Sequence, residues 1–200
     1  MGAILQSLGR TIVAGVVLLI VIIIVAGALS GKWTWISVGE QGWWQFFFRY
    51  LHVLSGVMWI GLLWYFNFVQ TPGMPKIPDE QKPAISKVIA PSALFWFRWA
   101  ALSTVVTGLI LAWLNGYIGR ALGIQEGTRA IGIGMWLGLI MAYNVWFIIW
   151  PNQKKVLGIV EASAEEKPKA AKLAGQTSRI NTLLSIPLLF CMVAQQNVPF

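Results

Sequence analysis

The stretch RYLHVLSGVMWIG, residues 49–61, holds the single histidine of this 200-residue chain. On a helix, one face would hold His52 together with Arg49, three residues before it, and with Gly56 and Trp59, four and seven residues after it. A neutral imidazole can bind iron, a glycine lets a flat cofactor approach the backbone, and an arginine can pair with a propionate. This face therefore has the chemistry that a membrane-bound haem b needs.

The same residues have a second interpretation. His52 follows Trp44 by eight residues, which on a helix places the imidazole about 12 Å inside the outer leaflet. A polar group at that depth is costly unless something satisfies it, and the carbonyl of a neighbouring helix would do so. Gly56 would then only let two helices pack closely. The spacing allows both interpretations, and both stay open.

The second axial ligand of such a haem is the weaker part of the hypothesis. With one histidine in the chain, the second ligand would be a weak donor such as a methionine, or the iron would be five-coordinate. Met135 lies at a similar depth in another apolar segment, although a methionine also serves as core filler. The candidate cofactor site is therefore Arg49, His52, Gly56 and Met135, with His52 as the metal ligand and no catalytic residue assigned.

The cysteine content excludes other redox centres. The single Cys191 cannot form an internal disulfide, a cysteine-cluster zinc site or an iron–sulfur centre. The chain has no C-x-x-C-H motif for covalently attached haem c.

Five apolar segments must position this site. Crossing a bilayer core takes about 20 helical residues, and segments of that kind cover residues 11–30, 43–70, 93–115, 130–150 and 180–196, the last one short and interrupted by Pro187. Hydrophobic residues make up 57% of the chain and charged residues 11%, against roughly 25% charged residues in soluble proteins. We predict an all-α integral membrane protein with one domain, residues 1–200, and a bundle of five transmembrane helices.

The charges between the segments predict an orientation. Ten lysines and arginines lie in the N-terminal tail and in the connections 71–92 and 151–179, against Lys32, Arg120 and Arg129 on the other side. The positive-inside rule then puts the N-terminus in the cytoplasm and the C-terminus outside. The net charge of +8 follows from this topology, so we expect the lipid bilayer and not nucleic acid as the partner.

Two connections carry local signals. Residues 71–83 hold three prolines in their first eight positions and are expected to begin as an irregular turn. Residues 151–179 are rich in Ala, Glu and Lys and are expected to extend the fourth and fifth helices as a cytoplasmic hairpin.

The twelve tryptophans are expected to anchor the protein at the two membrane boundaries. Arg98, beside the inner group, is expected to extend its guanidinium to the lipid head groups, or alternatively to contact an anion. The outer group is Trp33, Trp35, Trp43 and Trp44, and the inner group is Trp96, Trp99 and Trp150.

Four stretches resemble one known family in the order in which they occur. They are RYLHVLSGVMWIGLLWYFNFVQTP, APSALFWFRWAALSTVVTGL, GMWLGLIMAYNVWFIIWPNQKKVLG and AGQTSRINTLLSIPLLF. Over roughly residues 45–195 they resemble the membrane domain of PuuD-type urate hydroxylases, the urate oxidase N-terminal family. The core L-H-V-x-x-G-x-x-W-I-G also resembles, more loosely, the first helix of HemJ-type protoporphyrinogen oxidases and of copper-resistance membrane proteins.

The resemblance implies a multi-pass helix bundle of the bacterial inner membrane that binds haem and passes electrons outward. In urate hydroxylases a cytochrome c domain follows the membrane part, and in HemJ-type proteins a lysine accompanies the histidine equivalent to His52 as haem ligand. This sequence has neither a haem c motif nor a lysine in residues 130–150.

We therefore expect a standalone membrane domain that oxidises urate or a similar small reductant, or relays electrons to a separate cytochrome. One alternative is a non-catalytic accessory subunit of a larger respiratory or photosynthetic complex. A transporter is a third option, against which stand the small bundle and the lack of an inverted repeat.

Overall fold

The computed structural model describes residues 2–33 and 37–198, which excludes the predicted anchor Trp35. Within these residues every regular element is a helix and no strand occurs. The chain divides into two compact units, Met1–Phe47 and Phe48–Phe200. The single domain expected from the sequence, residues 1–200, stays a prediction.

The first unit consists of α1 (Gly2–Leu5), α2 (Leu8–Ser30) and the first turns of α3 (Gln41–Trp64). α2 is an almost uninterrupted apolar helix, and it ends at Gly31, which takes the left-handed conformation (φ 64°) typical of a helix C-terminus. The Trp33 ring lies against Gly27, where a Cβ would stand 2.7 Å from the ring. Glycine is therefore needed at position 27 for this contact.

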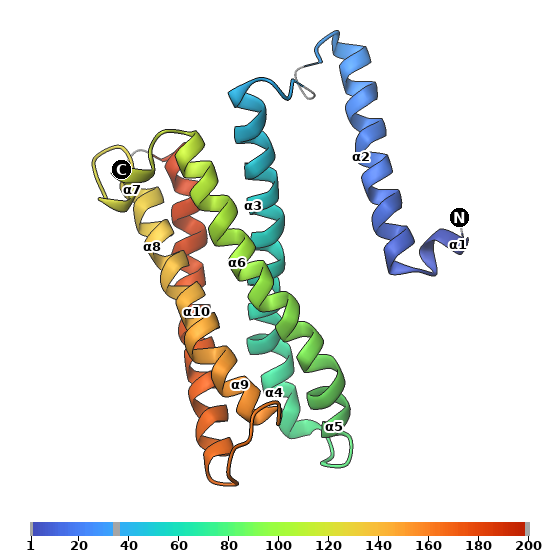
Figure 1. The fold of residues 1–200 in the computed structure, drawn as a ribbon, viewed down its shortest axis with the longest axis vertical. Coiled ribbons are helices and arrows are strands. Elements are labelled where there is room, and N and C mark those ends of the chain that lie inside the picture. Colours follow the sequence, from blue (N-terminus) through green and yellow to red (C-terminus); the bar gives the residue numbers. More distant parts are fainter. Residues whose placement is uncertain (1, 34–36, 199–200) are drawn as a thin grey trace. The chain divides into compact units, whose positions relative to one another are not determined.

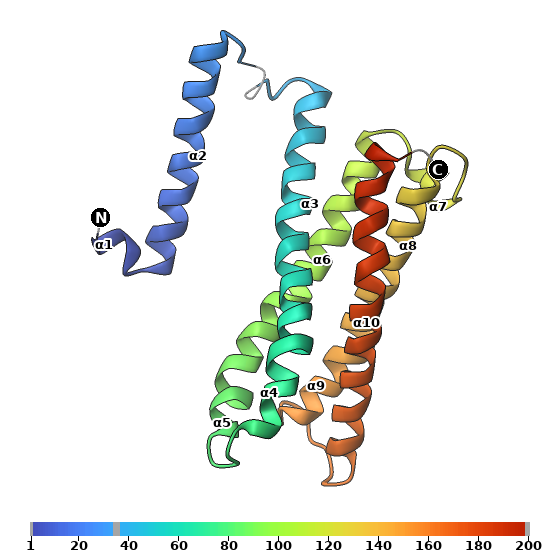
Figure 2. The ribbon, with the colours of Figure 1, turned by 180° about the vertical axis from the view of Figure 1, so that it is seen from behind.

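The second unit is built from four long helical runs, drawn in Figures 1 and 2 from opposite sides. α8 and α10 lie side by side in both views, with α3 and α6 as the other two principal helices. The short α7 (Ile118–Leu122) lies in the connection before α8. The runs are α3–η2 (Tyr65–Gln70)–α4 (Thr71–Gly73)–η3 (Met74–Lys76), α5 (Lys82–Ala84)–η4 (Ile85–Ile89)–α6 (Ala90–Leu114), α8 (Arg129–Tyr143)–η5 (Asn144–Ile149)–α9 (Trp150–Val156), and α10 (Glu166–Asn197).

Three of these runs contain a proline directly after a π-helical segment: Pro72 after η2, Pro91 after η4 and Pro151 after η5. A proline in an α-helix clashes with the carbonyl four residues before it. Here the residue before each proline donates its N–H to the carbonyl five residues back, as Thr71 does to Phe66. The wider π turn makes room for the ring, so the helices continue through these prolines.

Among the described residues, five helical runs are long and apolar enough to cross a membrane, namely Leu8–Ser30, Gln41–Lys76, Lys82–Leu114, Arg129–Val156 and Glu166–Asn197. This confirms the all-helical architecture with five such helices. Most runs are longer than predicted. The expected turn at residue 71 is wrong, because helix continues to Lys76. The expected hairpin is mostly helix, with residues 157–165 as its connection, and α10 passes Pro187 without a break.

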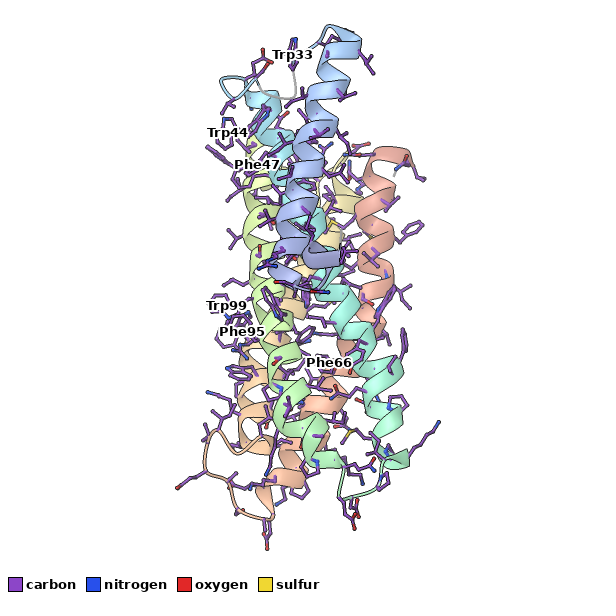
Figure 3. The ribbon with its side chains drawn as sticks, turned by 90° about the vertical axis from the view of Figure 1, so that its right-hand side faces the viewer. Trp33, Trp44, Phe47, Phe66, Phe95 and Trp99 are labelled. Carbon is purple, nitrogen blue, oxygen red and sulfur yellow. The ribbon has the colours of Figure 1, made fainter. Side chains whose placement is uncertain are left out.

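The core of the second unit lies between all four runs and is centred on large buried side chains such as Trp59, Leu63, Phe97 and Met141. Phe66 packs edge-on against Phe97, with ring centroids 5.8 Å apart, and Figure 3 labels its place on the first run. Two buried asparagines beside this core form hydrogen bonds with each other and with the main chain. Asn144 donates to the Asn181 side-chain oxygen at 2.8 Å, and Asn181 donates to the Met141 carbonyl at 3.0 Å.

Candidate functional site

A cavity of roughly 730 Å³ lies among α3, α6, α8 and α10. Its volume falls within the range of small-molecule sites, about 300–1,000 Å³. The lining is mostly apolar, with a few polar side chains contributed by α3, by α6 and the segment after it, and by the end of α10. The polar and charged members of the lining are Arg49, His52, Thr104, Tyr117, Gln196 and Asn197.

His52 is fixed by a main-chain hydrogen bond. Its Nδ1 lies 2.8 Å from the carbonyl oxygen of Thr104 on α6, and 3.5 Å from the hydroxyl of Thr107. A carbonyl oxygen only accepts, so Nδ1 carries the proton and Nε2 keeps a free lone pair. Histidines that ligate metals are oriented in this way, by donating their other ring N–H to a carbonyl or carboxylate.

The hydroxyls next to His52 are engaged elsewhere. Thr104 donates its hydroxyl to the Ala100 carbonyl at 2.7 Å, and Thr107 donates to the Ser103 carbonyl at 2.6 Å. The hydroxyls of Ser55 and Ser103 lie 2.8 Å apart. Within residues 2–33 and 37–198, no hydrogen bond reaches Nε2 of His52. The imidazole therefore presents an unpartnered lone pair at the wall of the cavity.

Glycines on two helices shape the space around the imidazole. A Cβ on Gly108 would stand 2.7 Å from Cε1 of His52, so α6 admits the ring only because position 108 has no side chain. At Gly56 the nearest atom to a Cβ would be Cγ2 of Thr104 at 3.9 Å, an ordinary contact distance. Close packing of α3 and α6 therefore does not require a glycine at 56.

The other predicted residues line the same cavity. Arg49 is exposed, while Met135 is half-buried and reaches the cavity from α8. Tyr117, which also lines it, lies close enough to Arg49 for their charges to interact. Burial raises the pKa of the Tyr117 phenol, and the positive charge of Arg49 offsets this only in part. The phenol is therefore a neutral O–H group at neutral pH.

Trp59 adds a polar atom that lacks a partner. Its side chain is 1% exposed and lines the cavity, and its indole Nε1 is buried with no hydrogen-bond partner among the described residues. Buried N–H groups are nearly always paired in native proteins. Because this nitrogen is itself buried, it assigns no contact with a ligand in the cavity.

Sequence spacing found part of this site. The structure brings Arg49, His52, Gly56 and Met135 to one cavity. The carbonyl contact expected from the packing interpretation is also present, but it engages Nδ1 only. Gly108, which its spacing with Ser103, Thr104 and Thr107 marks as a close-packing position, was not predicted as part of the site, and neither was Tyr117. The run of small and hydroxyl residues at 103, 104, 107 and 108 was the available signal, since it marks the face of α6 that His52 contacts.

Comparison with known protein families gives one match. The model of the family described as urate oxidase N-terminal matches residues 125–198. The matched segment covers α8, η5, α9 and α10, and it contributes Met135 to the cavity. Arg49, His52 and Gly56 precede the matched segment. The comparisons with curated proteins and with solved structures found no match.

Proposed function

We propose that this chain is a membrane redox protein of the urate oxidase N-terminal type that binds haem b through His52 and passes electrons to a separate cytochrome. The observation that carries the proposal is the imidazole whose Nδ1–H is held by the Thr104 carbonyl while Nε2 stays unpartnered at the cavity. The family match over residues 125–198 supports the same class of protein.

The residues present fit a haem. Among the described residues no group of three or more His, Cys, Asp or Glu side chains could hold a metal ion. Iron bound by His52 therefore needs additional nitrogen ligands, which a porphyrin supplies. His52 would bind the iron through Nε2, Met135 would be the other protein donor, and Arg49 would pair with the propionates. The open side of Gly56 leaves room for a flat ring.

The residues around the site have defined roles in this proposal. Thr104 holds the His52 ring in one orientation through its carbonyl and increases the basicity of Nε2. Arg49 is exposed, so it would attract a carboxylate through its charge and through two parallel hydrogen bonds from the guanidinium. When bound, haem b supplies a one-electron redox centre whose potential depends on its axial ligands and surroundings.

The proposed setting is the inner membrane of a bacterium, crossed by the five long apolar helices. The ten lysines and arginines of the N-terminal tail and of residues 71–92 and 151–179 support a cytoplasmic N-terminus, against three on the opposite side. In that orientation the C-terminus and the end of the cavity lined by Gln196 and Asn197 lie towards the outside. The orientation suits a donor that passes electrons to a cytochrome on that side.

An absorption spectrum of the purified protein reconstituted with haemin tests the proposal. We expect a Soret band that is lost in His52→Ala, and a changed spectrum with a weaker axial field in Met135→Leu. Ile133→Leu, an exposed position on the same helix, is the matched control and should leave the spectrum unchanged. A spectrum without a Soret band, or one unaltered in His52→Ala, contradicts the proposal. A haem-free chain that co-purifies with a larger assembly would support the non-catalytic accessory subunit instead.

A further inference from the structure

A second group of residues, remote in sequence from His52, has the features of an anion site. The guanidinium carbon of Arg98 on α6 lies 3.6 Å from the ring centroid of Trp150 and 5.8 Å from that of Phe95. The ammonium group of Lys154 on α9 lies 5.9 Å from the same Trp150 ring. One indole therefore brings together two cations from two different helices.

These two cations lack a counter-ion. Within residues 2–33 and 37–198, no carboxylate forms a salt bridge with Arg98 or Lys154. The neighbouring Lys155 differs, because Glu166 lies 3.7 Å from its ammonium group. Stacking on an aromatic ring stabilises a cation without neutralising it. An anion bound near the Trp150 ring would neutralise charge that the ring leaves in place.

The surroundings favour a lipid as the source of that anion. Phe95, Trp96 and Trp99 on α6 are 46%, 57% and 46% exposed, and Figure 3 shows Phe95 and Trp99 on the same side of the helix. Trp99 also packs edge-on against Trp146, with ring centroids 5.5 Å apart. Exposed aromatic rings beside basic residues are typical of the boundary between membrane and water.

We propose that Arg98, Lys154 and Trp150 bind the phosphate of an anionic phospholipid of the cytoplasmic leaflet. The planar guanidinium of Arg98 can donate two parallel hydrogen bonds to a phosphate, while Lys154 acts as a compact point charge. The exposed rings next to them contact the glycerol and the first methylenes of the lipid. Basic pockets between membrane helices on the cytoplasmic side recognise lipid head groups by this chemistry. The site is independent of what the His52 cavity binds.

Native mass spectrometry of the full-length protein in a neutral detergent tests the site, with phosphatidylglycerol and phosphatidylcholine as probes. We expect preferential retention of phosphatidylglycerol, weakened about fivefold by Arg98→Gln and about fivefold by Lys154→Gln, the size typical of one basic residue near a membrane. Lys155→Gln is the matched control, since it removes the same charge one residue away. It should bind phosphatidylglycerol as the unaltered protein does.

Each other outcome overturns the assignment. Equal losses in Lys154→Gln and Lys155→Gln would show diffuse attraction without a site. Displacement of the lipid by millimolar inorganic phosphate would assign the site to a soluble anion. Should Arg98→Gln fail to fold, Lys154→Gln decides alone, because position 154 lies in the last turns of α9. The Soret band should persist in both variants, which separates this test from that of the haem proposal.

Discussion

The imidazole of His52 and the backbone of Gly108 are in direct contact across two helices: a Cβ at position 108 would stand 2.9 Å from Nδ1 and 2.7 Å from Cε1. The Nδ1 hydrogen bond to Thr104 depends on this approach, because any side chain at 108 would push the ring away from α6. The orientation of the proposed ligand His52 therefore depends on the lack of a side chain at Gly108 on α6.

Gly108→Ala should weaken haem binding at least tenfold, because a Cβ at position 108 would displace the His52 ring and disrupt its hydrogen bond to Thr104. Loss of such an orienting hydrogen bond to a ligand histidine typically lowers metal affinity about 10–100-fold. Titration of the purified protein with haemin, followed at the Soret band, measures the effect. Gly175→Ala on α10 is the control, since position 175 does not line the cavity, a Cβ there has nothing within 4 Å and alanine favours a helix over glycine by about 1 kcal/mol. Equal haem affinity in the two variants would show that Gly108 does not set the ring position.

Asn181→Ala should destabilise the second unit by about 1–2 kcal/mol, in the upper range for polar contacts between membrane helices. Asn181 is 0% exposed, and its loss leaves the Asn144 side-chain amide without its acceptor and removes one of the donors to the Met141 carbonyl. Reversible unfolding in mixed detergent gives the free energy. Asn197→Ala removes only a bond within its own exposed turn and should be near neutral. A smaller cost for Asn181→Ala than for Asn197→Ala would refute the role of this network.

Gly132→Ala should destabilise the packing of α7 on α8, at a cost of about 1–3 kcal/mol for overpacking. A Cβ at position 132 would overlap the carbonyl oxygen of Ala121, a backbone atom that cannot turn aside as a side chain would. The melting temperature in detergent reports the change. Gly119→Ala on α7 has open space around it, and its melting temperature should match that of the unaltered protein or exceed it. If both variants melt alike, the close approach of Gly132 and Ala121 is not required.

Glu166→Ala should loosen the start of α10. The Glu166 side chain accepts from the Ser163 N–H at 2.9 Å, and the Glu166 N–H donates to the Ser163 hydroxyl at 3.1 Å, which together form a capping box. Hydrogen exchange of residues 163–170 should quicken about fivefold, the equivalent of about 1 kcal/mol for a lost cap. Glu165→Ala removes the adjacent carboxylate and should leave hydrogen exchange unchanged. Faster exchange in Glu165→Ala than in Glu166→Ala would exclude the capping box.

The sequence predicted the helical class and the five long apolar helices because both depend on composition and length alone. It underestimated the helix lengths where prolines occur. The prolines of residues 71–83 suggested a break. Whether a helix ends at a proline depends on the turn before it, and the composition of the π segment η2 does not predict such a turn. The same reason explains the helical residues 71–76.

The site was predictable only along single helices. Arg49, His52 and Gly56 are neighbours by helical spacing, so one segment sufficed to relate them. The contacts with Thr104 and Gly108 depend on how α3 crosses α6, and Tyr117 depends on the turn after α6. The hydrophobic periodicity of a single segment does not predict how two helices cross. Met135 was placed from its depth in a segment, and the cavity lining includes it.

The acceptor for His52 belongs to the main chain, so no side-chain substitution at position 104 can delete it. Evolutionary drift at 104 would change the packing around the ring and still leave its tautomer intact. Position 108 has no such freedom, since even the smallest added group meets the ring. In descendants that keep this histidine, invariance should therefore concentrate on the glycine rather than on the threonine whose oxygen makes the bond.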